Sequence, residues 1–150
     1  MAYREIVTIK NDEAILRKVC RPVTVFDDRL RGIIDDMVNT MHKADGVGIA
    51  APQVGIIRRI CVVETDELYC ELVNPIIVKQ SKKTQLGAEG CLSVPGEQHN
   101  VIRPMTVTVQ AYDRNGEPFE VTASGFSARA LCHEIDHLDG ILYIDKAVIE

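Results

Sequence analysis

The spacing of hydrophobic residues along the chain changes from a helical period to a strand period and then back to a helical one. Residues 11–19 predict a short helix near the N-terminus. After Asp27 and Asp28, five hydrophobic residues recur at helical spacing, namely Leu30, Ile33, Ile34, Met37 and Met41. Since no polar residue interrupts this stripe, we interpret it as the face of a second, longer helix that packs into the core.

From Gly48 onward the pattern becomes typical of strands. Residues 57–64 and 68–78 are rich in β-branched side chains. Further on, hydrophobic residues alternate with polar ones at Val107, Val109 and Ala111. The residues Asp113-Arg114-Asn115-Gly116 then predict a hairpin turn into a strand that carries Phe119, Val121 and Ala123.

The order of these elements predicts the fold class. Helices come first, several strands follow, and a last helix closes the chain, which indicates an α+β fold of antiparallel strands packed around a C-terminal helix. We find no repeat, low-complexity tract or linker, so residues 1–150 are expected to form one domain.

The last helical segment contains the most informative motif, His133-Glu134-Ile135-Asp136-His137. On a helix His137 lies only about 40° round from His133, so both imidazoles can reach one metal ion. Glu134 lies about 100° from His133, too far round to be an easy ligand but close enough to touch a water beside the ion. This placement suits the general base of a metal hydrolase.

The rest of this helix divides into further faces. Ala128, Leu131, Ile135 and Leu138 fall on the opposite side and predict a core face. A third sector is polar and is expected to face solvent, and it holds Arg129, Asp136 and Asp139. Ser124 or Ser127 could cap the start of the helix, and Gly140 is a suitable stop at its end.

A catalytic metal site of this kind needs a third protein ligand and an open position. Tyr143 stands where one family of zinc proteases has a further histidine, and Glu150 is the only carboxylate left that could serve as the downstream ligand of another. The ligand is therefore expected upstream, where the candidates are His42, His99, Cys20, Cys61, Cys70 and Cys91.

Cys91 is the favoured candidate among these. It lies in a segment bracketed by glycine and proline, residues 89–96, where an extended and exposed backbone could present a thiolate. The alternative, that Cys91 is a small buried hydrophobic residue, is the usual fate of a free cysteine and would be preferred for this residue alone. Cys132 adjoins the motif, but the helix points it away from the ion.

Three separated blocks carry a resemblance to a known family. They are Gly46-Val47-Gly48-Ile49-Ala50-Ala51-Pro52-Gln53, Glu89-Gly90-Cys91-Leu92-Ser93 and the histidine motif. In order and approximate spacing the chain resembles the peptide deformylases over essentially its whole length. The resemblance implies a metal-dependent hydrolase that removes the formyl group from the N-terminal formyl-methionine of newly made polypeptides and releases formate.

The resemblance also implies roles for individual residues. Cys91, His133 and His137 would bind the metal, and Glu134 would act as acid and base. The side-chain amide of Gln53 and the backbone N–H of Leu92 would stabilise the oxyanion. Without its flanking block, Gln53 would be interpreted as a surface glutamine at the end of a strand. Glu89 could hold a ligand or an arginine such as Arg103, or could equally be a solvated charge.

Substrate contacts are expected around the same blocks. The formyl hydrogen should lie against Gly48, and the methionine side chain should enter an apolar pocket on the ligand side of the helix. Helix geometry places Ala130 about 60° from His133, so that it is a candidate wall of this pocket. The resemblance adds Val47, Gly90 and Phe126 to the substrate-binding residues.

The predicted ligands do not determine which metal is bound. Thiolate and imidazole suit zinc, iron, cobalt or nickel, and affinity order alone does not choose among them. Resemblance to the deformylases implies ferrous iron, Fe2+, in the cell, with Zn2+ as a common but less active replacement.

Composition restricts partners and compartment. The net charge is −5 and no basic run occurs, so we expect no specific nucleic-acid binding and at most a weak, transient ribosome contact. No signal-like or membrane-length apolar stretch is found, and five cysteines without disulfide-like spacing favour a reducing interior, hence the cytoplasm.

The sequence departs from the deformylase pattern in two places, and two alternative functions remain open. The chain ends soon after the metal helix, and residues 97–100 stand where many relatives carry an aromatic residue or an arginine, with His99 as a possible rim residue. A metal-stabilised binding module without turnover is one alternative, although Glu134 argues against it. An amidase or protease acting on other acyl groups is the other.

Overall fold

The structure is a computed structural model that describes residues 2–149, and its main feature is a five-stranded antiparallel sheet in the order β1-β2-β3-β6-β7. These strands are β1 (Gly48–Ala50), β2 (Ile60–Glu64), β3 (Tyr69–Gln80), β6 (Thr106–Tyr112) and β7 (Pro118–Ser124). A second, two-stranded sheet is the hairpin of β4 (Thr84–Cys91) and β5 (Val94–Pro104).

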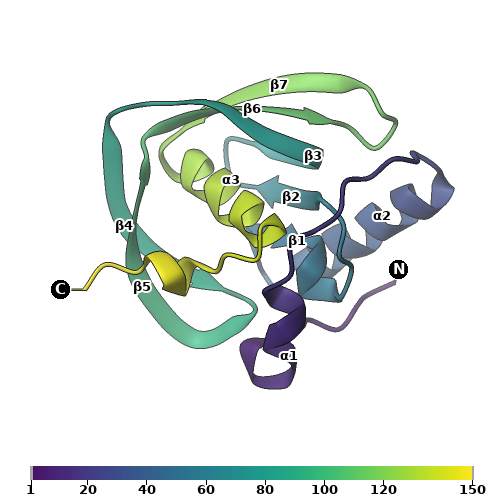
Figure 1. Cartoon of the computed structure of the whole chain (residues 1–150), viewed down its shortest axis with the longest axis horizontal. Helices are drawn as coiled ribbons and strands as arrows, with labels where there is room; N and C mark the ends of the chain where they lie inside the picture. Colours follow the sequence, from purple (N-terminus) through teal and green to yellow (C-terminus); the bar gives the residue numbers. More distant parts are fainter. Residues whose placement is uncertain (1, 150) are drawn as a thin grey trace.

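Within residues 2–149, three α-helices and two short 3-10 helices complete the fold. They are α1 (Ile9–Leu16), α2 (Asp28–Lys43), η1 (Ala51–Val54), α3 (Gly125–Leu138) and η2 (Tyr143–Lys146). Figure 1 shows α3 in the middle of the molecule, with the β4–β5 hairpin on one side and the larger sheet on the other. The predicted α+β fold with antiparallel strands around the C-terminal helix is confirmed.

Strand β2 lies at the centre of the core because both of its faces are buried. Cys61 and Val63 pack in the cluster that contains α3, whereas Ile60 and Val62 pack in the cluster that contains α2. Burying one such side chain contributes about 1.5–3 kcal/mol. Helix α3, which carries the histidine motif, therefore packs on one side of β2, and α2 packs on the other side.

The predicted long helix is confirmed as α2. The side chain of Asp27 caps it by accepting a hydrogen bond from the backbone N–H of Leu30, and its stripe is buried except for the partly covered Ile33. The predicted short helix is displaced toward the N-terminus. It begins at Ile9 because Thr8 and Asn11 form a capping box there, and it ends at Leu16.

The predicted strands are present with shifted ends. Residues 57–59 lie outside β2, since Arg58 forms only an isolated bridge with Arg21, and β3 continues two residues beyond 78. The hairpin turn at Asp113–Gly116 joins β6 to β7 as predicted, with Val109 opposite Val121 and Ala111 opposite Phe119.

The β4–β5 hairpin was not predicted as a pair of strands. Its first strand is polar and contains two glycines, so its composition lacks the β-branched signal that marked the other strands. Cys91 pairs with Val94 across a two-residue turn, so the segment proposed as extended backbone is the tip of a hairpin. This tip brings Cys91 to α3.

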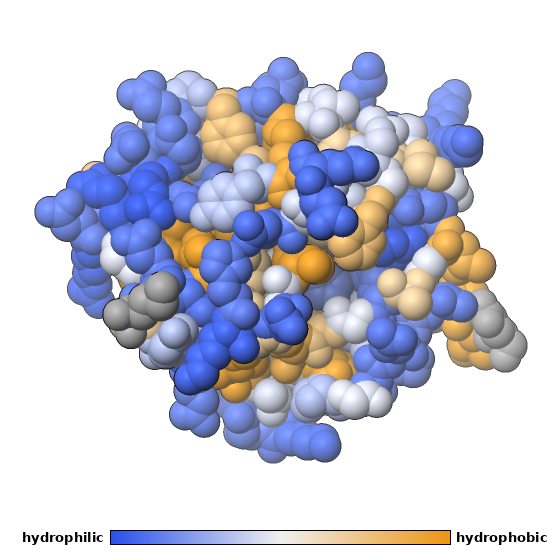
Figure 2. Space-filling view, turned by 180° about the vertical axis from the view of Figure 1, so that it is seen from behind, coloured by the Kyte–Doolittle hydropathy of each residue, from blue (hydrophilic) through white to orange (hydrophobic). Residues whose placement is uncertain are grey.

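The face shown in Figure 2 is mostly hydrophilic. Apolar side chains gather in several smaller areas on it, near its middle and at parts of its edge. Among residues 2–149, no helix has the length and apolar character needed to cross a membrane.

Candidate active site

The position of α3 is set at both of its ends. Ser124 is the N-cap residue by its backbone, but its hydroxyl bonds Thr106 rather than the helix, so the predicted side-chain cap is absent. Gly140 follows the helix with φ of 74°, and a Cβ there would lie 2.3 Å from the carbonyl oxygen of Arg17. The predicted glycine stop is confirmed, and it also lets the helix end dock against the segment after α1.

The faces of α3 agree with the sequence on two sides and disagree on the third. The core face is buried as predicted at Ala128, Leu131, Ile135 and Leu138. The predicted solvent face is wrong for Arg129, which is only 4% exposed. The β4–β5 hairpin covers this side of the helix, and Arg129 is charge-compensated there.

Cys91, His133 and His137 come together as one group. One ligand atom from each lies within 4.8 Å of the others, and the Cys91 Sγ lies 3.4 Å from His137 Nε2. One thiolate and two imidazoles form the three-ligand set of a catalytic metal site, with a further position left for water. The group is therefore consistent with a divalent metal ion.

The remaining ligand candidates lie elsewhere. His42 pairs with Glu64 on the surface, and His99 contacts Glu97 on β5. Cys20, Cys61, Cys70 and Cys132 are buried free thiols outside the metal group. The sequence argument that pointed Cys132 away from the ion agrees with this arrangement.

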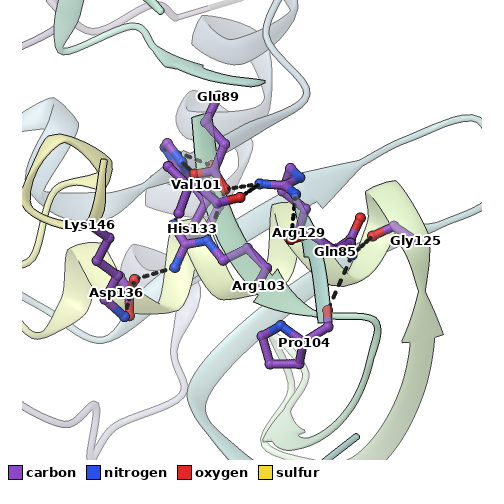
Figure 3. Close-up of polar contacts among 11 residues, drawn as sticks. Gln85, Glu89, Val101, Arg103, Pro104, Gly125, Arg129, His133, Asp136 and Lys146 are labelled. Carbon is purple, nitrogen blue, oxygen red and sulfur yellow. Dashed lines mark hydrogen bonds and ion pairs between the residues drawn. The ribbon is translucent and has the colours of Figure 1, made fainter. Parts of the chain in front are cut away.

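Glu89 is a buried hub that holds a ligand and two arginines at once (Figure 3). Its Oε1 lies 2.9 Å from His133 Nδ1 and accepts a hydrogen bond of 2.9 Å from Arg103. Its Oε2 accepts one of 2.7 Å from Arg129. The reading of Glu89 as a solvated charge is therefore wrong, and its predicted contacts with Arg103 and with a candidate ligand, His133, are present.

The hub extends along α3. Arg103 Nη1 also donates to Asp136 at 2.6 Å, and Lys146 pairs with the same carboxylate at 3.1 Å. Arg129 further donates to the carbonyl oxygen of Val101 at 2.9 Å. Because Glu89 occupies Nδ1 of His133, Nε2 is left to face the metal position, which is how carboxylates commonly orient metal-binding histidines.

Charges around the group shift its pKa values. Burial would lower the pKa of His133, but Glu134 and Cys91 outweigh burial and raise it to about 10. Burial and the charge on His133 lower the pKa of His137 well below its usual value. Burial would raise the pKa of Glu89, but hydrogen bonds from Arg103 and His133 hold it well below its usual range. Negative groups thus favour positive charge at the position where a metal would sit.

Glu134 is a buried carboxylate that lies beside the metal group. Its Oε2 is 4.0 Å from His133 Nε2, and its buried Oε1 has no hydrogen-bond partner among residues 2–149. Burial raises the pKa of this carboxyl to about 7. A buried oxygen without a partner indicates that a water or a substrate belongs beside it.

Gln53 is oriented by its own backbone neighbours. Its Oε1 accepts a hydrogen bond of 2.9 Å from the backbone N–H of Ala50, so its Nε2 points toward the metal group. That nitrogen donates to Ser93 Oγ at 3.1 Å and lies 3.6 Å from Cys91 Sγ. The reading of Gln53 as a surface glutamine is wrong, because the side chain is buried.

A cleft of about 530 Å³ joins these groups to solvent. All of the predicted substrate residues line it, together with both predicted oxyanion residues: Val47, Gly48, Gly90, Phe126, Ala130, Gln53 and Leu92. Cys91, His133 and Glu134 form part of the same wall. Gln98 lines the cleft, whereas His99, the expected rim residue, does not.

Sequence reasoning missed two residues that support the site. Arg129 joins α3 to both hairpin strands, and the pairing that makes this possible was not predicted. Tyr143 stacks on His133 with ring centroids 5.8 Å apart, and its hydroxyl donates to the carbonyl oxygen of Glu97 at 3.1 Å. The only feature of the sequence that pointed to Tyr143 was its position three residues after Gly140, where one family of zinc proteases has a metal-binding histidine.

Comparisons with known proteins agree with this geometry. A family model described as polypeptide deformylase matches residues 3–149. A peptide deformylase of Alkaliphilus metalliredigens is 47% identical over 150 residues, which cover 100% of both chains.

Solved structures match to a similar extent. The crystal structure of peptide deformylase from Thermotoga maritima has a TM-score of 0.94 and 36% identity, covering 99% of this chain and 100% of that one. A class I type b peptide deformylase from Acinetobacter baumannii has a TM-score of 0.93 and 39% identity, covering 97% and 99%.

Proposed function

The chain belongs to the peptide deformylase family and removes the N-terminal formyl group from newly made polypeptides, and from this premise we propose which of its residues carry out the reaction. The proposal depends above all on one observation. Cys91, His133 and His137 converge beside the unpartnered Oε1 of Glu134 in the wall of one cleft.

The three converging side chains are the proposed metal ligands. The ion would be held by Cys91 Sγ and by Nε2 of both histidines, with His133 oriented by Glu89. When bound, a divalent ion supplies a Lewis acid and lowers the pKa of a neighbouring water. We propose Fe2+ as the working ion from the family resemblance, with Zn2+, Ni2+ or Co2+ as substitutes that the same donor set can hold.

Glu134 is the proposed acid and base. Its Oε1 has no hydrogen-bond partner in the described part of the chain, so it can accept a proton from the attacking water. Attack on the formyl carbonyl gives a tetrahedral oxyanion, and Glu134 then returns the proton to the leaving amine. Formate and a free N-terminus are released.

Gln53 and Leu92 are the proposed oxyanion donors. The hydrogen bond from Ala50 fixes the Gln53 amide with its NH₂ toward Cys91, and Leu92 lies in the turn directly after Cys91. Both groups are thereby held beside the metal group before substrate binds. Loss of one such donor typically raises the barrier by about 3 kcal/mol.

The apolar part of the cleft is the proposed methionine pocket. Val47 and Phe126 line the cleft with 45% and 56% of their surface exposed, and the buried Ala130 lines the same cleft. Gly48 lies against Glu134, so this wall of the cleft leaves little space beside the expected position of the reacting carbonyl. A formyl hydrogen fits such a wall better than the methyl of an acetyl group.

Turnover of formyl-Met-Ala against acetyl-Met-Ala, run anaerobically with metal analysis of the same sample, tests this assignment. We expect strong preference for the formyl peptide, and a smaller preference of about 1–3 kcal/mol for methionine over alanine at the first residue. Comparable turnover of the two acyl groups would instead favour a general amidase.

We propose the binding partners and the cellular compartment that the sequence predicts. The substrate is formylated nascent chains, any ribosome contact is transient, and residues 1–150 act as one catalytic domain. Five free cysteines support a reducing compartment such as the cytoplasm.

A further inference from the structure

A second cavity, of about 790 Å³, lies apart from the catalytic cleft and collects arginines from three separate segments. We call it the arginine groove and define it by Arg4, Arg21, Arg29 and Arg58. None of these residues lines the catalytic cleft. The chain has a net charge of −5 and no basic run, so only the fold brings these side chains together.

Three of the arginines stand where a positive charge is unfavourable. Arg21 and Arg58 are direct partners in a parallel bridge, and like charges placed side by side on strands repel each other. Arg29 lies in the first turn of α2, where the helix dipole disfavours a cation. Such local conflicts are expected at binding sites, where a ligand of opposite charge resolves them.

The protein itself supplies little compensation. Among residues 2–149, the side chains of Arg21 and Arg29 have no hydrogen-bond or ion-pair partner, and both are exposed. Arg58 donates only to the backbone carbonyl oxygen of Ile57. The groove also contains two acidic residues, Asp36, which pairs with Arg4, and Asp27, which caps α2, so the four arginines leave it with a net charge of +2.

The groove also has an apolar floor. Val23, Leu30 and Ile60 are buried beneath it, and Ile33 and Ile56 are partly buried along it. A ligand that fits must therefore carry negative charges for the arginine rim and flat or apolar parts for the floor. Nucleic acid combines phosphates with ribose and bases in this way, whereas a free inorganic anion has no group for the floor.

We propose that the arginine groove binds the phosphate backbone of RNA without reading its sequence. The guanidinium fork of arginine matches phosphate oxygens, and phosphate contacts supply affinity without sequence information. The inference goes beyond the deformylation reaction. It gives an enzyme that acts on newly made polypeptides a means of staying near RNA-rich surfaces, while leaving the catalytic cleft open to the peptide.

Fluorescence anisotropy with a labelled RNA hairpin, using the metal-loaded protein, provides the first test. With three to four phosphate contacts, log K should fall with log salt concentration with a slope of about −3. Absence of binding at 50 mM salt would overturn the proposal, and so would a mononucleotide that binds as tightly as the hairpin, because it would indicate a small-anion site.

A matched pair of variants provides the second test. Arg21→Glu/Arg29→Glu reverses both unpartnered charges, and Lys82→Glu/Lys83→Glu makes the same change in net charge on exposed residues of the β3–β4 turn. We expect the first variant to weaken RNA binding by about tenfold or more and to reduce the salt slope by about 2, because about 1 is lost for each phosphate contact. The second variant should change affinity by less than about threefold, the general effect of net charge alone.

Activity separates this inference from damage to the fold. Turnover of formyl-Met-Ala should be the same in both variants as in the wild type, since neither variant touches the cleft. Equal weakening of RNA binding by both variants would show nonspecific charge and overturn the groove. A glutamate-rich peptide that binds more tightly than RNA and depends on the same arginines would also overturn it, in favour of an acidic protein.

Discussion

Gly48 lies so close to Glu134 that a Cβ at position 48 would be 2.4 Å from the Glu134 Oε2 and 2.9 Å from its Cγ. Glycine is therefore required at this position by the space that the carboxylate occupies rather than by its backbone angles, because Gly48 is not among the glycines with positive φ. Strand β1 thus lies directly against the proposed base and limits where its carboxylate can be.

Gly48→Ala should accordingly push the Glu134 carboxylate out of its position. We expect kcat to fall by a factor on the order of 10², because displacement of a catalytic group by about 1 Å has an effect of this size. Metal content should remain near one per chain. Gly32→Ala is the matched control, since nothing lies within 4 Å of a Cβ there, and it should leave kcat unchanged. Equal activity of both variants would show that Glu134 tolerates displacement.

Glu134→Ala tests the role of this carboxylate directly. Removal of the proposed proton acceptor should lower kcat by a factor on the order of 10²–10⁴ while metal content stays near one per chain, because no ligand is lost. Single-turnover kinetics and metal analysis on the same preparation check both points. Parallel loss of metal and activity would make Glu134 a ligand instead.

Sequence periodicity was sufficient for the elements whose burial is local. Helical spacing placed His133 and His137 on one face of α3 and Ala130 in the cleft wall, and Asp27 marked the start of α2. These inferences hold because the angle between residues on one helix does not depend on the rest of the fold.

The parts that could not be predicted depend on partners distant in the chain. Helix spacing predicts that Arg129 faces solvent, yet the β4–β5 hairpin covers it and Glu89 balances its charge. The hairpin itself could not be predicted, because its glycines and polar residues have low strand propensity. Pairing between its two strands stabilises it instead. Tyr143 reaches His133 only through the chain reversal after Gly140.

Cys91→Ala should release the metal or leave it loosely bound, because one of three proposed ligands is lost. Cys132→Ala, a change of the same size one residue before His133, should retain the metal, since Cys132 lies outside the metal group. Metal content after dialysis against a weak chelator distinguishes the two variants. Loss of metal from both would assign the effect to disturbance of α3.

The same thiol should dominate chemical labelling. Burial raises the pKa values of Cys20 and Cys132 to about 11 and also raises those of Cys61 and Cys70, so these four thiols are protonated and shielded at pH 8. Mass spectrometry of the metal-free native protein after brief alkylation should find one modification per chain, at Cys91, and bound metal should prevent it. Several modified thiols would contradict the assignment.

Glu89→Gln should destabilise the protein strongly. The substitution keeps the shape of the side chain but leaves Arg103 and Arg129 without their buried countercharge, and breaking such a pair typically destabilises by about 3–5 kcal/mol. Metal affinity should fall by about 10–100-fold, because His133 loses its orienting partner.

Glu71→Gln is the matched control for this prediction. Glu71 also accepts two hydrogen bonds from one arginine, Arg114, but the pair is more exposed than Glu89 and Arg103. Its loss should lower the free energy of unfolding by less than the loss of Glu89, because Arg114 keeps Asp35 as a second countercharge, and it should leave metal affinity unchanged. Denaturant unfolding curves that give similar losses for both variants would remove the special role of the buried hub.

Ala130→Phe should test whether the methionine side chain enters the cleft beside α3. Ala130 is buried and lines the cleft, so a phenyl group there would fill space that the substrate needs. We expect KM for formyl-Met-Ala to rise or turnover to cease, with metal content unchanged because no ligand or hub residue is altered. Ala14→Phe, the same substitution at an exposed position of α1, should leave KM and kcat unchanged. If Ala130→Phe keeps the wild-type preference for methionine over alanine at the first residue, the methionine pocket must lie elsewhere in the cleft.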